Sequence, residues 1–304
     1  MQNNLFIENL KQSTGMRVLL FLIILLISSL IGAAIAAVFM FSDDTGLRIA
    51  QGLSSIMMFV VPPIVYYYIT RNTNQLQALG FRKMERPGLF LLTGLALMFF
   101  ALPVTEQLTH WNEAMSFGPA FSKLEEYLKM MEERSQTAIE QIVNTDKFGD
   151  LLLNLLIIAL IPAIGEELTF RGVLQQSLTR RMNPHLAIIL SAAIFSFIHF
   201  QFYGFLPRMF LGMLLGYMFY ISGSLWPSIL MHFVNNGTVV VLYYLNNKGI
   251  INVDMENFFG ESMSVLLVIA CAVSITWLIV WTWIKAKLEQ PTEATPIAPP
   301  TGND

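Results

Sequence analysis

The chain has 304 residues, of which 55% are hydrophobic and only 13% are charged. A soluble domain usually has about a quarter of its residues charged, so the composition excludes an ordinary soluble protein and indicates a membrane protein. The net charge of −3 offers no basic surface, and we expect no nucleic-acid partner. The single cysteine, Cys271, excludes an intrachain disulfide and a zinc–thiolate cluster.

Apolar runs of roughly 20 residues, the length that crosses a bilayer, recur along the chain. The predicted spans are residues 17–41, 48–69, 88–105, 152–178, 185–203, 206–222, 225–246 and 263–284. Because lipid offers no partner to backbone N–H and C=O groups, we expect each span to be a helix. The predicted fold class is therefore all-α: a polytopic membrane helical bundle of about eight transmembrane helices, in contact with membrane lipid.

The first span begins like a cleaved signal peptide, with Arg17 before the apolar run and small residues in GAAIAAV. The run continues through Phe41, however, which is long for the apolar region of a signal peptide. We therefore expect a retained first helix.

Orientation is predicted from the Lys and Arg residues of the short loops, which favour the cytoplasm. These residues are Lys11 and Arg17 before the first span, Arg71, Arg82, Lys83 and Arg86 after the second, Arg180 and Arg181 after the fourth, and Lys285 and Lys287 after the eighth. With eight spans, all of them fall on one side. We expect an integral membrane protein with both termini in the cytoplasm, and the short chain suggests a bacterial inner membrane.

Residues 120–145 have apolar side chains at helical spacing, which predicts an amphipathic helix on the outer surface. We interpret it as a packing lid rather than a substrate gate, because apolar periodicity specifies only burial. Three units are predicted. Residues 1–147 hold three membrane helices and this outer helix, residues 148–286 form the catalytic membrane core, and residues 287–304, rich in Pro and Thr, form a disordered tail.

Charged residues inside the fourth span need partners or a function, because burial of a charge in lipid costs several kcal/mol. Glu167 and Arg171 are four residues apart on one helix face and are expected to pair. Glu166 points about 100° away from Glu167 and needs a different partner. Arg208, near the outer end of the sixth span, is expected to snorkel or to bind a lipid headgroup, and contact with a substrate terminus is the less favoured alternative.

Two further pairs lie on single helix faces: Phe195 with His199, and His232 with Asn236. If the chain turns near residue 183, Glu166 and His199 both lie about 25 Å from that turn. The polar end of the fourth span can project about 10 Å beyond the hydrocarbon core, which brings Glu166 and His199 near the middle of the membrane. His232 and Asn236 lie about 13 Å and 20 Å above a second turn, SGSLWP, on the same side of the membrane. The four side chains can therefore occupy one layer near the middle of the membrane.

This layer supports two mechanisms. A glutamate beside an imidazole can activate water as a general base, while a second histidine and a carboxamide stabilise an oxyanion. Alternatively, Glu166, His199 and His232 could hold zinc with an open position for water. The spacing alone leaves both mechanisms open.

The motifs Glu166-Glu167-Leu-Thr-Phe-Arg171, Phe195-Ser-Phe-Ile-His199 and His232-Phe-Val-Asn-Asn236 resemble those of the CPBP family of intramembrane proteases. That family includes the type II CAAX prenyl endopeptidases and bacterial relatives linked to bacteriocin processing, immunity or lysostaphin resistance. The resemblance implies an eight-helix fold in which Glu166 and His199 activate water. It also implies that His232 and Asn236 form the oxyanion site and that Glu167, Arg171 and Phe195 orient it.

The function expected from the resemblance is an intramembrane endopeptidase that cleaves membrane-associated proteins or peptides, including CAAX-type prenylated ones. No cofactor is expected in the water mechanism, and zinc is the alternative. Two other readings are a non-catalytic immunity or scaffold protein and a transporter that relays protons. The complete motif set favours the protease, and no pair of broken helices indicates a transporter repeat.

Overall fold

The computed structural model describes residues 14–39, 44–70, 75–253 and 264–288. Within these residues every regular element is helical, which confirms the all-α prediction. The α-helices are α2 (Thr14–Phe39), α3 (Asp44–Ser55), α4 (Val61–Ile69), α5 (Gln75–Leu79), α6 (Pro87–Glu113), α7 (Ser122–Val143), α8 (Phe148–Asn154), α9 (Ile161–Glu167), α10 (Gln176–Thr179), α11 (Pro184–Phe197), α12 (Phe205–Ser222), α13 (Leu225–Asn247) and α14 (Val265–Leu288). Lys11, Arg71 and residues 289–304 of the predicted tail lie outside the described residues.

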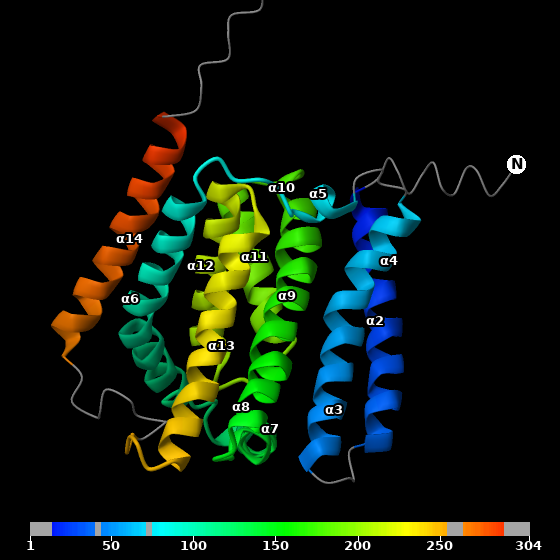
Figure 1. The fold of residues 1–304 in the computed structure, drawn as a ribbon, viewed down its shortest axis with the longest axis vertical. Helices are drawn as coiled ribbons and strands as arrows, with labels where there is room; N and C mark the ends of the chain where they lie inside the picture. Colours follow the sequence, from blue (N-terminus) through cyan, green and yellow to red (C-terminus); the bar gives the residue numbers. More distant parts are fainter. Residues whose placement is uncertain (1–13, 40–43, 71–74, 254–263, 289–304) are drawn as a thin grey trace, which may run out of the picture.

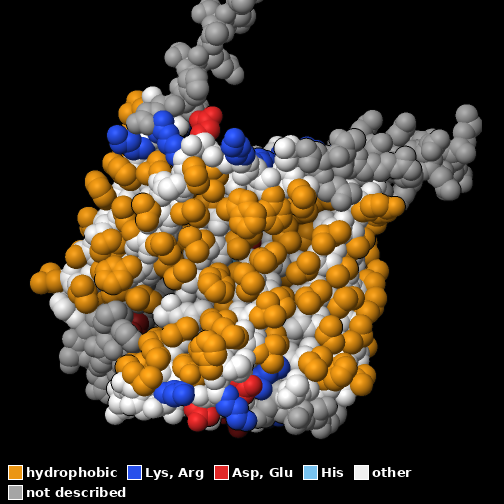
Figure 2. All heavy atoms as spheres, viewed as in Figure 1, with side chains coloured by type: hydrophobic (Ala, Val, Ile, Leu, Met, Phe, Trp, Pro, Cys, Tyr) orange, Lys and Arg blue, Asp and Glu red, His pale blue; other side chains and the backbone are white. Residues whose placement is uncertain are grey.

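The helices stand side by side in one bundle (Figure 1). Helix α2 packs against α3 at one edge, and α14 packs against α6 at the opposite edge. Helices α9, α12 and α13 lie between them, and α7 lies across one end. On the face that Figure 2 shows, hydrophobic side chains cover the surface between two charged ends, as expected of a protein whose sides face lipid.

Seven helices in the described part of the chain are long and apolar enough to cross a membrane. They are Gly15–Phe39, Thr45–Ile69, Pro87–Glu113, Phe148–Thr179, Phe205–Ser222, Leu225–Asn247 and Val265–Leu288. These segments confirm an integral membrane protein and match seven of the predicted spans.

The predicted span 185–203 is wrong in its extent. Helix α11 has 14 residues and ends at Phe197, so it is about 21 Å long and shorter than the hydrocarbon core of about 30 Å. The chain then turns through residues 198–204, where Phe200 adopts a positive φ of 53°, and returns as α12. His199 therefore lies in this turn rather than within a helix.

Proline explains two widened, π-helical turns in the bundle, at Ile56–Val60 before Pro63 and at Leu155–Leu160 before Pro162. A proline has no N–H and cannot donate to the carbonyl four residues earlier. In both places another part of the bundle supplies the donor. Thr169 Oγ1 donates to the Phe59 carbonyl at 2.9 Å, and Asn236 Nδ2 donates to the Ile158 carbonyl at 3.3 Å. These bonds tie neighbouring helices together next to the polar motifs.

Candidate functional site

Glu167 and Arg171 form the buried ion pair that their spacing predicts. Arg171 Nη1 lies 2.7 Å from Glu167 Oε1, and the two side chains are 1% and 0% exposed. The second guanidinium nitrogen, Nη2, donates to the Gly212 carbonyl on α12 at 2.7 Å. Arg171 thereby links the helix of Glu167 to α12, and the two side chains form a hydrogen-bonded pair in an apolar interior.

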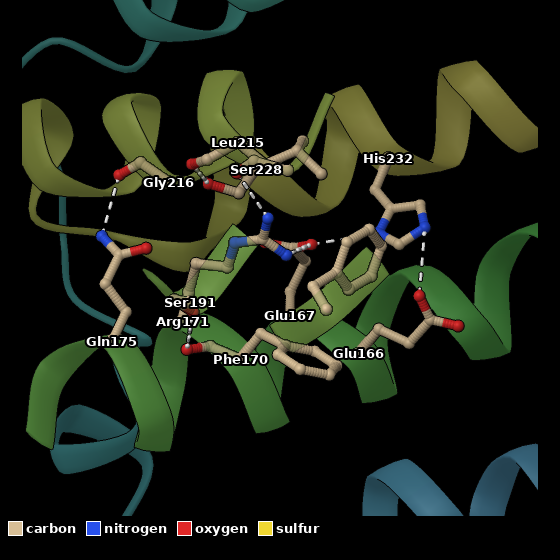
Figure 3. Close-up of polar contacts among 12 residues, drawn as sticks. Glu166, Glu167, Phe170, Arg171, Gln175, Ser191, Leu215, Gly216, Ser228 and His232 are labelled. Atoms are coloured by element: carbon tan, nitrogen blue, oxygen red, sulfur yellow. Dashed lines mark hydrogen bonds and ion pairs between the residues drawn. The ribbon is translucent and has the colours of Figure 1, made fainter. Parts of the chain in front are cut away.

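His232 connects this ion pair to Glu166 (Figure 3). Its Nδ1 lies 3.0 Å from Glu167 Oε1, and its Nε2 lies 3.6 Å from Glu166 Oε2. Because an ionised carboxylate only accepts hydrogen bonds, Nδ1 carries the proton that is donated to Glu167. Nε2 is then directed at Glu166, where it can take up or return a proton.

Glu166 therefore has the separate partner that its helical position predicts, and that partner is His232. The side chains of Glu166 and His232 are 9% and 6% exposed, so the pair is shielded from solvent. The resemblance assigned His232 to the oxyanion and His199 to Glu166. The joint activation of water by Glu166 and His199 stays a prediction.

Phe195 packs against both imidazole rings. Its ring centroid lies 5.1 Å from that of His199 and 6.0 Å from that of His232, with edge-to-face geometry in both cases. The Arg171 guanidinium lies 5.1 Å from the Phe195 centroid. The buried phenylalanine thus packs against three polar groups at once, in keeping with the orienting role expected of it.

His199 and Asn236 are both held by backbone carbonyls. His199 Nδ1 donates to the Phe195 carbonyl at 2.8 Å, which leaves Nε2 as the acceptor. Asn236 donates to the Ile158 carbonyl, and its Oδ1 accepts from Asn235 Nδ2 at 3.1 Å. One N–H of Asn236 therefore has a structural role, and the second is available to a ligand.

A cavity of about 260 Å³ brings the predicted site residues together. Glu166, His199, His232 and Asn236 all line it, and Phe195 forms part of its wall. They come from α9, the turn after α11, and α13. The depth estimate from the sequence therefore placed these four side chains around one space correctly.

The cavity is also lined by residues that we did not predict from the sequence to belong to the site. Arg208 and Asn235 line it together with Met98, Gly204, Pro207, Leu211 and Leu215. The expectation that Arg208 contacts lipid is thus corrected, because its side chain faces the cavity. A charge within an apolar run was the available signal, but the lipid-facing and cavity-facing sides of that run have similar apolar residues.

The zinc alternative requires three donors around one point. Within the described residues, no group of three or more His, Cys, Asp and Glu side chains has the spacing of a metal site. His232 is engaged by both glutamates, and His199 uses Nδ1 on a carbonyl. The donors of Glu166, His199 and His232 do not gather as a ligand set, and we derive no step through a metal.

Comparison with known proteins gives one family. Residues 148–238 match the model of the type II CAAX prenyl endopeptidase Rce1-like family. No curated protein and no solved structure matches the chain. The matched segment runs from the start of α8 into α13 and contains all three motifs. In this segment the chain is similar to the Rce1-like type II CAAX prenyl endopeptidases, and the match supports membership of the CPBP family of intramembrane proteases.

Proposed function

We propose that this protein is an intramembrane endopeptidase that hydrolyses membrane-associated proteins or peptides with a water activated by Glu166. The observation that carries the proposal is the contact between Glu166 and His232 at the edge of a cavity inside an apolar bundle. Burial of a carboxylate and an imidazole in such a position costs free energy, so their presence there indicates a function. Family membership supports a protein substrate.

The proton transfers follow from the hydrogen bonds. Glu166 takes a proton from water while the water oxygen attacks the carbonyl carbon of the substrate. His232 Nε2 can receive that proton, because Glu167 stabilises the resulting imidazolium through Nδ1. The proton then passes to the amide nitrogen as the C–N bond breaks. One water is consumed, and a carboxylic acid and an amine are formed.

The tetrahedral intermediate needs donors for its oxyanion. The second N–H of Asn236 and the side chain of Asn235 both line the cavity and are neutral donors of the required type. His199 lines the same cavity, with its Nε2 available to orient the water. In this assignment Asn236 both holds its helix in register and serves the reaction.

A second, larger groove of about 670 Å³ supplies a route for the substrate. It shares Met98, Gly204 and Asn235 with the cavity. Its walls include Phe99 and Val239, which are 69% and 42% exposed on the lipid-facing surface. A substrate dissolved in the bilayer can therefore enter sideways between α6 and α13 without crossing the charged ends of the bundle.

The test is hydrolysis by the purified protein in detergent of a prenylated CAAX peptide and of a set of membrane peptides. Glu166→Gln keeps the shape of the side chain and removes the base, so we expect the rate to fall at least about 100-fold. Arg134→Gln, at an exposed position on α7, is the control and should cleave like wild type. Equal rates for wild type and Glu166→Gln would reject the proposal, and a protein that cleaves nothing would favour a non-catalytic scaffold.

A further inference from the structure

The catalytic cavity and the substrate groove meet at a junction of three residues. Among the described residues, Met98, Gly204 and Asn235 line both the cavity of about 260 Å³ and the groove of about 670 Å³. Met98 belongs to α6, Gly204 to the turn before α12, and Asn235 to α13. Glu166 lines the cavity and not the groove. A substrate that enters through the groove therefore passes this junction to reach Glu166.

Two of the three junction residues have little freedom to move. Gly204 has no side chain, and a Cβ at this position would lie 2.7 Å from Arg208 Nη2, so the space beside its backbone is already filled. Asn235 Nδ2 donates to Asn236 Oδ1 at 3.1 Å, which fixes the direction of its carboxamide. The width of the junction therefore depends on the third residue, Met98.

Met98 has the flexible apolar side chain of the junction. A methionine has three rotatable bonds in its side chain and adapts its shape to the groups that it contacts. Met98 is 6% exposed and packs in the same apolar cluster as its neighbour Leu97. Leu97 is 0% exposed and lines neither space, as expected of a residue that only fills the core. Met98 differs from it because its side chain also faces the cavity and the groove.

The cavity beyond the junction is small. Ligand pockets usually measure about 300–1,000 Å³, and this cavity of about 260 Å³ has to hold the attacking water as well as part of the substrate. The groove, at about 670 Å³, is much larger. A bulky side chain therefore fits on the groove side of the scissile bond, whereas the residue on the cavity side has to be compact.

Asn235 relates the scissile bond to the same junction. Its carboxamide is one of the donors proposed for the oxyanion, which forms on the scissile carbonyl. Met98 lines the same two spaces as Asn235, and an extended peptide advances only about 3.3 Å per residue. The residue that enters the cavity directly beyond the scissile bond therefore lies next to Met98.

We infer that Met98 is a specificity-determining residue that limits the size of the substrate side chain on the cavity side of the scissile bond. Glycine, alanine and serine are favoured at that position over large apolar and aromatic residues. This inference rests on the proposed function. It deepens that function because it names the class of sequence that is cleaved and the side chain that selects it.

The experiment takes a peptide that wild type cleaves and varies the residues on the two sides of the scissile bond, one at a time, among alanine, leucine and phenylalanine. Wild type is expected to prefer alanine to phenylalanine by at least about 10-fold in kcat/KM at one of the two positions, because one surplus methylene in a filled pocket lowers kcat/KM by about 10- to 200-fold. In Met98→Ala this preference should fall below about threefold through faster cleavage of the phenylalanine peptide. Met98→Phe should narrow the junction and reject the leucine peptide as well.

Two control variants separate selection from packing. Leu97→Ala removes an apolar side chain from the same cluster on the same helix, so it should lower stability and keep the alanine-to-phenylalanine ratio within about threefold of wild type. Met98→Leu conserves the side-chain volume and should also keep the ratio. Size-exclusion profiles and unfolding temperatures check that each variant is folded, and Met98→Val replaces Met98→Ala if the alanine variant is unfolded.

The outcomes separate this inference from the proposed function. If wild type cleaves all the peptides alike and Glu166→Gln cleaves none, the role of Met98 is overturned and the proposed protease function stands. An equal loss for all peptides in Met98→Ala also overturns the role, since that result indicates packing alone. If wild type cleaves neither a prenylated CAAX peptide nor any membrane peptide, the proposed function fails and the inference fails with it.

Discussion

His232 bridges two adjacent glutamates, with Nδ1 at 3.0 Å from Glu167 Oε1 and Nε2 at 3.6 Å from Glu166 Oε2. The two carboxylates occupy neighbouring positions in the sequence but have different surroundings. Glu167 is completely buried and bonded to Arg171, whereas Glu166 lines a cavity. The same residue type therefore has a structural role at one position and a proposed chemical role at the next.

This difference predicts that alanine at position 167 mainly lowers stability, whereas alanine at position 166 mainly lowers activity. Glu167→Ala leaves the buried Arg171 without its carboxylate, so the free energy of unfolding should fall by about 3–5 kcal/mol. Glu166→Ala should abolish hydrolysis and change the free energy of unfolding by less than about 1.5 kcal/mol. Thermal unfolding of the two variants in the same detergent measures the stability changes, and peptide hydrolysis measures the activity. A larger loss of stability in Glu166→Ala than in Glu167→Ala would contradict this division of roles.

The bond between Asn236 and the Ile158 carbonyl predicts a coupling with Pro162. Asn236→Ala leaves that carbonyl without a donor, at a cost of about 1–3 kcal/mol in stability. In a Pro162→Ala background the backbone N–H of residue 162 can supply the missing bond. The stability cost of Asn236→Ala should therefore be smaller in the double variant. A double-mutant cycle measures this coupling, and a coupling energy of zero would contradict the explanation.

Gly172 allows a close approach between the helix that carries Glu167 and Arg171 and the segment that ends at Leu79. A Cβ at this position would lie 2.8 Å from the Leu79 carbonyl oxygen, which is backbone and cannot easily move. We expect Gly172→Ala to lower the free energy of unfolding by about 1–3 kcal/mol. Gly149→Ala is the matched control, because nothing lies within 4 Å of its Cβ. This variant should gain up to about 1 kcal/mol from helix propensity, and equal effects of the two changes would refute the packing argument.

The arrangement of donors also predicts the response to chelators. Since Glu166, His199 and His232 do not gather as a three-ligand set, we expect hydrolysis to proceed at an unchanged rate after prolonged treatment with a strong zinc chelator. The rate of hydrolysis is measured before the treatment and again after the chelator has been removed. Loss of activity that zinc restores would show that the site rearranges around a metal.

Much of the site was accessible from the sequence, because its main features depend on local periodicity. The four-residue spacing of Glu167 and Arg171 fixes their pairing on one helix face. The rise of 1.5 Å per residue was enough to place Glu166, His199, His232 and Asn236 at one depth. Depth along a helix depends on counting residues, and errors of one or two residues change it little.

The contacts between side chains of different helices could not be predicted from the sequence in the same way. Whether Glu166 contacts His199 or His232 depends on how each helix is rotated about its axis, which the sequence pattern does not specify. The end of α11 was also missed, because the apolar residues continue from Phe197 through the turn that contains Phe200 and Phe202. Hydropathy cannot distinguish an apolar turn from the continuation of a spanning helix.

The carbonyl of Ile158, which Pro162 leaves without a backbone donor, helps to fix the position of Glu166, the proposed catalytic base, along its helix axis. Pro162 lies four residues before Glu166, and Asn236 lies four residues after His232, so one side-chain bond locks the two helices at a single mutual offset. A slip by one residue would move Glu166 by about 1.5 Å along its axis, a large fraction of its 3.6 Å separation from His232. The separation of Glu166 and His232 thus depends on the N–H that Pro162 lacks. A residue with an N–H at position 162 would compete with Asn236 for the Ile158 carbonyl and weaken the link between the two helices.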